Sequence, residues 1–556
     1  MQTRKAQTAM AGWNQIQYPI SNNIPITSNL RVANVLQTSN TFEGTSMIDP
    51  TLNLHPDDEH NRELAAHVHP ADWRNPTPEG RYNLVVLGAG TAGLVAAAGA
   101  AGLGARVALV ERHLMGGDCL NVGCVPSKAI IRSAHAAHAV RFAGTFGIEV
   151  TGTTAVDFAA VMERMRGLRA GISPHDSARR FAEDYGIDVY FGDARFTSAD
   201  AIQVAGAQLR FVRAVIATGA RAATPPIPGL HEAGFLTNHN VFNLTEQPRR
   251  LAVIGGGPIG CELAQTFARL GTEVTIIETA EGFLQREDRK AAEILKSSME
   301  RDGVVVRLST SLERVQEKGV AKVLFLRTPS GEETITVDQI LVGVGRTPNI
   351  EGLDLEKAGV AFDRRGVTVD DSLRTTNRRI YASGDVCLPF KFTHTADATS
   401  RAVIQNALFP GPKKRLSKLV IPWCTYTDPE IAHVGLYPQQ AESQGVAVDT
   451  WEVAMADVDR AITDGETEGF LKVHCRQGSD TILGATIVGG RAGDLISEIT
   501  TAMVAGMGLG SFSGVIHPYP TRAEIIRKAA DAYNRTKLTP TAASLLKKWF
   551  RFKRRR

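Results

Sequence analysis

Apolar and polar positions between residues 82 and 111 follow the order of a strand, a turn, a helix and a second strand. Residues 82–87 form a mostly apolar run typical of a buried parallel strand. A glycine-rich turn and an alanine-rich stretch follow, and the apolar run at 106–110 ends in Glu111. The glycines, the alanines and Arg106 favour a helix, turn and strand over a membrane span. We therefore predict a βαβ unit.

The same pattern recurs at 251–254, where an apolar run leads into glycines, a helix and a second run closed by Glu278. Such glycines let a pyrophosphate approach a helix N-terminus, and the acid accepts a ribose hydroxyl. Two units predict two dinucleotides. The predicted fingerprint residues are Gly88, Gly90, Gly93 and Glu111 in the first unit, and Gly255, Gly257, Gly260 and Glu278 in the second.

Two cysteines lie five positions apart soon after the first unit, within residues 116–128. Neighbouring thiols can exchange two electrons as a dithiol and a disulfide. A bond between Cys119 and Cys124 adds little stability, because it closes a very short loop. Half of a zinc site and two unrelated core cysteines are the alternatives, but further zinc ligands are not offered nearby. The pattern favours redox chemistry, and we predict no metal-ligating residues.

The order of these motifs resembles that of the pyridine nucleotide-disulfide oxidoreductases, the flavoenzyme family of lipoamide dehydrogenase, glutathione reductase and mercuric reductase. The resemblance covers residues 81–536 and includes, besides the three motifs above, ATGA at 217–220, GRTPN at 345–349, ASGD at 382–385 and YTDPEIA at 426–432. It implies an α/β fold with two Rossmann-like dinucleotide-binding domains and a C-terminal α/β interface domain that forms a homodimer.

The resemblance also implies where the domains begin and end. We expect an N-terminal extension, partly disordered, a discontinuous FAD-binding domain, an NAD(P)-binding domain inserted into it, a dimerisation domain and a basic tail. Their expected bounds are 1–80 for the extension, 81–230 and 351–418 for FAD, 231–350 for NAD(P), 419–537 for dimerisation and 538–556 for the tail.

Roles for single residues follow from the same resemblance. FAD is expected at the first fingerprint and NADH or NADPH at the second. Cys124 is implied to face the flavin and Cys119 the substrate, so that electrons pass from nicotinamide through FAD to this pair. Asp385 matches an aspartate at the ribityl and pyrophosphate region, Lys128 a lysine beside the flavin, and Glu262 a glutamate near the nicotinamide. The motifs add Thr218, Gly219 and Gly345 as cofactor-binding residues.

The choice of nicotinamide can be argued from charge. An acid that closes the second strand favours a free ribose 2′-hydroxyl and repels a 2′-phosphate. Glu278 holds that place, so we expect NADH. Arg286 follows a few residues later and could reach a phosphate, which leaves NADPH as the alternative.

In lipoamide dehydrogenase and glutathione reductase, the C-terminal acid-base residue is a histidine directly before Pro-Thr. Registered on Pro520 and on Glu524, that position is Tyr519 here, and His517 falls two residues early. An imidazole near neutrality can protonate a leaving dithiol, whereas an ordinary tyrosine mostly cannot. This departure disfavours lipoamide and glutathione disulfide, although a register slip would restore His517.

Tyrosine at this position resembles mercuric reductase, whose acceptor is a soft metal ion. That enzyme ends in a vicinal cysteine pair, whereas this sequence has no cysteine after Cys475 and none before Cys119. We therefore expect a small-molecule electron acceptor: a soft metal ion, a small disulfide or a quinone. The alternatives are a dihydrolipoamide dehydrogenase-type reductase, an NADH oxidase, against which the cysteine pair argues, and a non-catalytic membrane-docked flavoprotein.

The two ends of the sequence lie outside the resemblance. Met47 is a candidate for the true start, with the first 46 residues an over-extended reading frame. The histidines at 55, 60, 67 and 69 fit a helix and loop packed on the FAD domain better than a metal site. At the other end, seven basic residues alternate with large apolar ones over 545–556. These suit an anionic membrane surface, and a frayed solvated tail is the alternative.

Composition adds three constraints. Removing the seven basic tail residues from the net charge of +4 leaves −3, so the body offers no field for nucleic acid. Six cysteines and no secretory signal fit a reducing cytoplasm, with peripheral membrane contact through the tail as an option. The other four cysteines sit singly and are expected to be buried and inert; they are Cys261, Cys387, Cys424 and Cys475.

Overall fold

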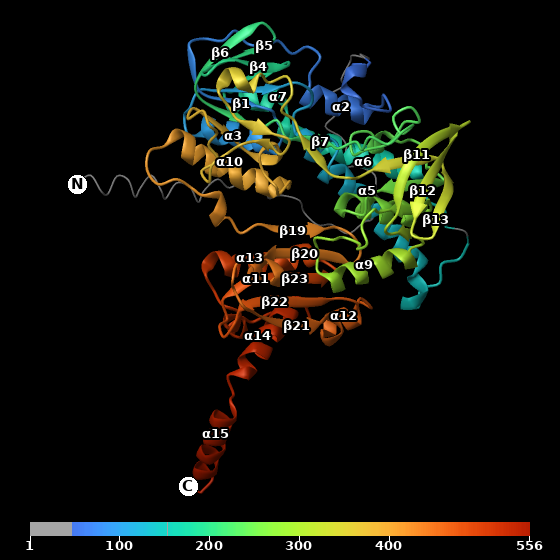
Figure 1. Ribbon diagram of the computed structural model, residues 1–556, viewed down its shortest axis with the longest axis vertical. Coiled ribbons are helices and arrows are strands. Elements are labelled where there is room, and N and C mark those ends of the chain that lie inside the picture. The colour runs from blue at the N-terminus through green and yellow to red at the C-terminus, as the bar shows by residue number, and fades with distance from the viewer. Residues whose placement is uncertain (1–46, 153, 556) are drawn as a thin grey trace, which may run out of the picture. The chain divides into compact units, whose positions relative to one another are not determined.

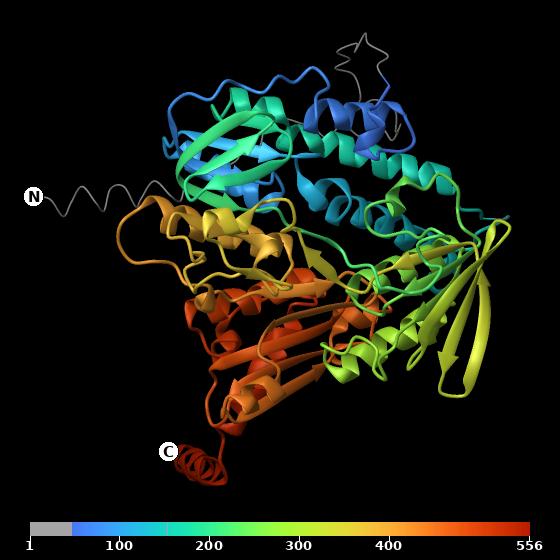
Figure 2. The same cartoon turned by 45° about the horizontal axis from the view of Figure 1, so that its top comes forward.

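The computed structural model describes residues 47–152 and 154–555, which build three main sheets with their helices (Figures 1 and 2). The suggestion that the native protein begins at Met47 concerns residues outside this range. The predicted α/β class is confirmed, with both βαβ units present and a third α/β unit after them.

The first sheet has the order β3-β2-β1-β6-β5-β4, with β18 also paired to β6. Strand β1 pairs in parallel with β2 and β6, as a βαβ unit requires. The strands are β1 (Arg81–Leu87), β2 (Val107–Glu111), β3 (Asp188–Phe191), β4 (Ala194–Ser198), β5 (Ala201–Val204), β6 (Ala207–Ile216) and β18 (Ile380–Ala382).

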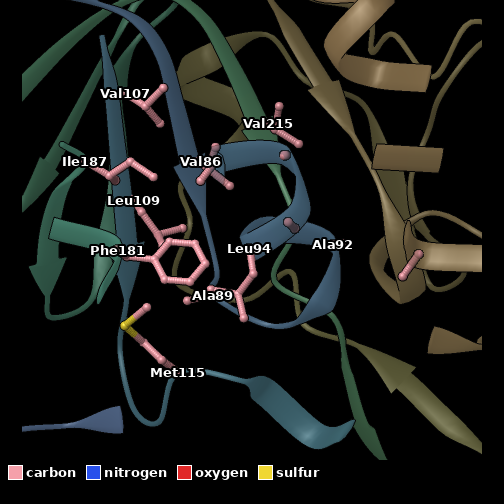
Figure 3. Close-up of a cluster of buried hydrophobic side chains, with 14 of the residues drawn as sticks. Val86, Ala89, Ala92, Leu94, Val107, Leu109, Met115, Phe181, Ile187 and Val215 are labelled. Atoms are coloured by element: carbon pink, nitrogen blue, oxygen red, sulfur yellow. The ribbon is translucent and has the colours of Figure 1, made fainter. Parts of the chain in front are cut away.

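Helix α3 (Thr91–Gly102) packs on this sheet and carries the alanine-rich stretch of the sequence. Figure 3 shows Val86 and Leu109 of the strands meeting Leu94 of α3 and Phe181 in one apolar core. Helix α10 (Thr393–Leu408) lies against α3. The approach is close, because a Cβ on Gly99 would stand 2.5 Å from Ile404.

The second sheet is parallel throughout, in the order β10-β9-β8-β14. Helix α8 follows the glycine turn and is buried along most of its length. A separate antiparallel sheet, β11-β12-β13, stands beside it in both views. The bounds are β8 (Arg250–Ile254), α8 (Pro258–Leu270), β9 (Glu273–Ile277), α9 (Arg289–Arg301), β10 (Val305–Arg307), β11 (Ser311–Lys318), β12 (Ala321–Thr328), β13 (Gly331–Val337) and β14 (Gln339–Val342).

The C-terminal sheet is antiparallel, in the order β19-β20-β23-β22-β21, and packs on α13 and α14 around its own apolar core. Its elements are β19 (Pro422–Thr425), β20 (Glu430–Gly435), α11 (Pro438–Ser443), β21 (Val448–Ala454), α12 (Asp459–Thr463), β22 (Phe470–Arg476), β23 (Ile482–Gly489), α13 (Ala492–Ala505) and α14 (Glu524–Thr536).

The remaining elements connect these layers. They are α2 (Glu59–Val68), α4 (Gly117–Asn121), α5 (Cys124–Arg141), α6 (Phe158–Ile172), α7 (Ala178–Glu183), α15 (Pro540–Lys553), the two-stranded pairs β7 (Ala220–Ala222) with β15 (Arg346–Pro348) and β16 (Phe362–Asp363) with β17 (Gly366–Val367), and single turns of 3₁₀ helix that include η2 (Pro50–Leu52) and η5 (Val241–Asn243). Within the described part of the chain, none of the helices has the length and apolar content to cross a membrane.

Several predicted boundaries differ from the structure by a residue. Strand β2 begins at Val107 rather than Arg106 and includes Glu111. The expected helix near the histidines exists as α2 and packs on the FAD domain as predicted, since Leu64 and Val68 are fully buried in the core of the first sheet. The C-terminal tail, for which a frayed solvated segment was the alternative, forms the helix α15, in which no residue is buried.

Candidate active site

Both glycine turns, both strand-end acids and both paired cysteines line a single cavity of about 2900 Å³. This volume exceeds the roughly 300–1,000 Å³ of an ordinary ligand pocket. One connected space therefore has room for two dinucleotides that meet near the cysteines.

The first glycine turn is shaped by close packing of backbone on backbone. A Cβ on Gly88 would stand 2.4 Å from the Ala217 carbonyl, and one on Gly93 would stand 1.7 Å from the Gly88 carbonyl. Gly90 precedes α3 as its N-cap, so the first N–H groups of that helix open toward the cavity. This is the arrangement that binds a pyrophosphate at a helix N-terminus.

Glu111 is held rigidly beside that turn. One carboxylate oxygen accepts the Ala89 N–H at 2.7 Å and the other accepts the His113 N–H at 2.8 Å. The carboxylate thus lies at the start of α3, where a ribose hydroxyl would meet it.

The second turn repeats this geometry. A Cβ on Gly260 would stand 2.1 Å from the Gly255 carbonyl, whereas the space in front of Gly257 is open. Glu278 accepts the Gly256 N–H at 2.8 Å and the Ala280 N–H at 2.9 Å, in the manner of Glu111. The two predicted fingerprints therefore share the same backbone geometry, a tight glycine turn beside a carboxylate that accepts two backbone N–H groups.

The cysteine pair lies at the junction of α4 and α5, and both residues are free thiols. Cys124 is the first residue of the 18-residue helix α5, whose N-terminal dipole favours a thiolate. Hydrogen bonding from Cys119, with further contributions from Thr393 and Lys128, lowers the pKa of Cys124 to about 6. The same hydrogen bond, together with burial, raises the pKa of Cys119 far above its usual value.

Three side chains around Cys124 come from distant parts of the chain. Thr393, the first residue of α10, places its hydroxyl 3.3 Å from the Cys124 sulfur. Lys128, one turn along α5, pairs with Glu262 of α8 at 2.7 Å and lies over the Tyr426 ring at 4.4 Å. Glu262 also accepts the Tyr426 backbone N–H at 2.9 Å. The ion pair keeps the Lys128 ammonium group near the Cys124 thiolate.

Asp385 lies on the cavity wall in a charged cluster. Arg346 forms ion pairs with both Asp118 and Asp385, the latter at 3.3 Å. Burial raises the pKa of Asp385, and the Arg346 guanidinium acts in the opposite direction. Lys391 donates to the Asp385 carbonyl at 2.6 Å.

The remaining predicted cofactor residues tie two segments together at the same cavity. Thr218 donates to the Asn349 carbonyl at 2.7 Å, and the Asn349 side chain donates back to the Thr218 carbonyl at 2.9 Å. The Asn349 N–H also bonds to the carbonyl of Gly219 at 3.0 Å. Gly345 has a φ of 115°, which favours glycine at this turn.

These residues fit FAD at the first fingerprint. The glycine turn leaves room for a pyrophosphate, Glu111 suits a ribose, and Asp385 and Lys128 flank the space that leads to Cys124. The donor set at the second fingerprint fits a pyridine nucleotide in the same way.

The predicted catalytic residues of the C-terminal segment lie away from the cavity of their own chain. Tyr519 is 72% exposed and donates to Asp459 at 2.8 Å, while His517 lies 2.9 Å from Glu498. Glu524 is buried and pairs with Arg527. None of the three predicted catalytic residues in this segment lines the cavity of its own chain, as far as the described residues show.

The single cysteines differ among themselves. Cys261 and Cys475 are buried as expected. Cys387 and Cys424 are only partly covered, and Cys424 lies on the cavity wall. Burial raises the pKa of Cys387 to about 12 and that of Cys424 still further, so neither is a thiolate near neutral pH.

Comparison with known proteins agrees with this site. Residues 82–407 match the family model described as pyridine nucleotide-disulphide oxidoreductase, and residues 421–530 match its dimerisation domain. The chain is 36% identical to a mercuric reductase of Staphylococcus aureus over 458 residues, 82% of this chain and 83% of the relative. It is 35% identical to a dihydrolipoyl dehydrogenase of Thermus scotoductus over 469 residues, 82% and 98% of the two chains.

The solved structures that resemble this chain are also flavoprotein disulfide reductases. The HOCl-induced flavoprotein disulfide reductase RclA of Escherichia coli superposes with a TM-score of 0.72 and 28% identity, over 80% of this chain and 99% of the other. Its Cu(II) complex matches with the same TM-score and identity. The chain therefore belongs to the pyridine nucleotide-disulphide oxidoreductases, a family of FAD-dependent flavoproteins that use pyridine nucleotides.

Proposed function

We propose that the protein oxidises NAD(P)H and passes the electrons through FAD to the Cys119–Cys124 pair, and from there to a soft metal ion. The observation that carries this proposal is the position of the Cys119–Cys124 pair in the cavity that both glycine turns line, with the Thr393 hydroxyl 3.3 Å from the Cys124 sulfur. The environment of the pair makes the two thiols unequal, since it lowers the pKa of Cys124 to about 6 and raises that of Cys119. FAD, when bound, supplies a carrier that accepts a hydride from nicotinamide and yields an electron pair to a disulfide.

The protein residues determine what happens to the protons. Reduction of the disulfide by one NAD(P)H gives NAD(P)⁺, one thiol and one thiolate, and the pKa values assign the proton to Cys119 and the charge to Cys124. Thr393 and Lys128 hold that charge, since both lower the pKa of Cys124. Because the helix dipole of α5 adds to them, the reduced pair is stable as a thiol and a thiolate near neutral pH.

A soft metal ion is the acceptor that this arrangement favours. Thiolate sulfur is the preferred ligand of soft metals. When a divalent metal ion takes the two electrons, the disulfide re-forms and the Cys119 proton is released to solvent, so that no proton donor is needed. The side chain at the position of that histidine is Tyr519, whose phenol is a weaker acid than an imidazolium, and the hydrogen bond to Asp459 raises its pKa further. The mercuric reductases and the Cu(II) complex of RclA give this choice its precedent. A small disulfide, as in the dihydrolipoyl dehydrogenases, and a quinone are the competing acceptors.

NADH is the proposed reductant. Glu278 keeps a carboxylate at the start of α8, where a 2′-phosphate would meet a negative charge and a free hydroxyl would find an acceptor. Arg286 also lines the cavity and is the residue through which NADPH could bind instead.

The dimerisation-domain match supports a homodimer. We place Tyr519, His517 and Glu524 at the interface between subunits, where they would act on the cavity of the other copy. Exposed apolar side chains around this segment support that placement; they are Val504, Met507, Val515 and Ile516.

A turnover panel tests the acceptor. The purified holoenzyme is supplied with NADH and, in turn, Hg(II) with excess thiol, Cu(II), lipoamide, glutathione disulfide and a soluble quinone. We expect a metal ion to give the highest kcat/KM and to lose its turnover in Cys119→Ser. Fast lipoamide turnover would show that the acceptor is a disulfide and that the register at Tyr519 is wrong.

We further propose that α15 docks on an anionic membrane surface. At about 100° per residue, its large apolar side chains occupy one arc of roughly 160° and most of its basic residues the opposite side. The apolar residues are Leu545, Leu546, Trp549, Phe550 and Phe552, all exposed. Anionic lipid contributes about 1 kcal/mol for each basic residue near the surface.

Co-sedimentation with liposomes tests the docking. Full-length protein and a variant truncated after Ala543 are mixed with vesicles of phosphatidylcholine alone or with added phosphatidylserine. We expect only the full-length protein to pellet, and only with the anionic vesicles. Equal pelleting of the two proteins would reject the proposal.

A further inference from the structure

The segment at residues 49–69, which precedes the part of the chain matched by the family model, forms one wall of the cofactor cavity. Three consecutive residues of this segment, Leu52, Asn53 and Leu54, line the cavity. The segment has no counterpart in the two glycine fingerprints, so its presence at the cavity is a separate feature of this chain.

Both ends of the segment contact the loop that carries Glu111. The Thr51 carbonyl accepts a hydrogen bond from the His113 ring at 3.2 Å, and the His69 ring bonds to the His113 carbonyl. The Met115 N–H donates to the Val68 carbonyl at 3.1 Å. His113 also donates its N–H to the Glu111 carboxylate, so the same residue contacts both the segment and the predicted ribose-binding acid.

Asn53 and His55 of the segment contact the opposite side of the cavity, at η5 and the residues just before it. The Asn243 side chain donates to the Asn53 carbonyl at 2.8 Å and accepts the His55 N–H at 3.4 Å. The Asn53 side chain donates to the His239 carbonyl at 3.4 Å. Both His239 and Asn243 line the cavity, so the segment joins two of its walls.

Buried side chains anchor the segment on either side of its contacts with η5. Leu52 and Leu54 are each 5% exposed within the core of the first sheet. Asn61 of α2 is fully buried and accepts a hydrogen bond from Arg169 at 2.6 Å. Arg169 in turn donates to the Asn121 carbonyl at 2.7 Å, at the end of the helix that carries Cys119.

We propose that residues 49–69 act as a clasp that retains the adenosine end of FAD. Glu111 marks that end of the cofactor, and the clasp contacts the Glu111 loop on one side and η5 on the other. FAD can leave past this wall only after the hydrogen bonds between the clasp and η5 break. These bonds are few and polar, whereas the buried leucines of the clasp stay in place. The clasp therefore sets the rate of FAD release and leaves the thiol chemistry unchanged.

The substitution Asn243→Ala tests the clasp, with Asn75→Ala as its matched control. Asn243 makes two hydrogen bonds to the backbone of the clasp at the cavity and a longer one, at 3.5 Å, to the Asn53 side chain. Asn75 makes two to the backbone of Phe191, at 2.8 Å each, and lies outside the cavity lining. Each variant thus loses two side-chain to backbone bonds, but only Asn243→Ala loses bonds that hold the clasp to η5.

Release of FAD is followed in the full-length holoenzymes by the gain of free-flavin fluorescence after dilution into mild chaotrope. We expect release from Asn243→Ala to be about tenfold faster than from the wild type, and release from Asn75→Ala to be unchanged. Unchanged release from Asn243→Ala, or equal acceleration in both variants, would overturn the proposal. So would a melting temperature of the Asn243→Ala apoprotein clearly below that of Asn75→Ala, because the loss would then be one of folding. These outcomes do not depend on the identity of the electron acceptor.

Discussion

Removal of the Cys119 thiol should raise the pKa of Cys124. The hydrogen bond from Cys119 is the largest of the contributions that bring this pKa from 9.0 to about 6. A hydrogen bond to a charged group contributes about 1.5–3 kcal/mol, which corresponds to about one to two pH units. Because Cys124 is open to the cavity, solvent screening favours the lower end. We therefore expect a pKa of about 7 in Cys119→Ala.

The rate of alkylation measures this shift, since only the thiolate reacts. Reduced protein is treated with iodoacetamide across a pH series, and mass spectrometry follows the Cys124 peptide. The midpoint of the rate profile should lie near pH 6 in the wild type and about one unit higher in Cys119→Ala. Cys475→Ala, which removes a buried thiol elsewhere, should leave the midpoint unchanged. An unshifted midpoint in Cys119→Ala would refute the account of the thiol pair.

Three further predictions concern the cofactor sites. Glu278→Ala should lower the preference for NADH over NADPH about tenfold in kcat/KM, and an unchanged ratio would remove Glu278 from the ribose site. Lys128→Met should raise the midpoint of Cys124 alkylation, because a positive charge that lowers this pKa is lost; a lower midpoint would contradict that role. Gly93→Ala should abolish FAD binding, since its Cβ would meet the Gly88 carbonyl, whereas Gly102→Ala in the same helix meets open space and should retain FAD. Absorbance of the purified proteins decides this last comparison.

The parts of the site that are built from residues close together in the sequence could be predicted. Gly88, Gly93 and Gly260 occupy places where backbone approaches backbone, and only glycine fits there. The strand-end acids could be predicted as well, because the length of a βαβ unit fixes where the second strand ends. The cysteine pair was recognisable because five positions are spanned by a single turn of chain.

Contacts between distant segments could not be predicted. Thr393 lies 269 positions from Cys124, and Glu262 lies 134 positions from Lys128, so no spacing relates them. The resemblance to the family assigned roles to Lys128 and Glu262 one by one, but their ion pair depends on how α5 packs on α8. The cavity wall formed by Leu52, Asn53 and Leu54 could not be predicted either, because two leucines around one asparagine are too few positions to show a periodicity.

The most direct test of the central claim is anaerobic titration of the holoenzyme with NADH. If electrons reach the Cys119–Cys124 pair, the two-electron-reduced enzyme should show a long-wavelength absorbance band from the Cys124 thiolate beside the flavin. The band should disappear in Cys124→Ala and, on acidification, below about pH 6, where the thiolate takes up a proton. Complete reduction of the wild type without such a band would contradict the proposed electron path.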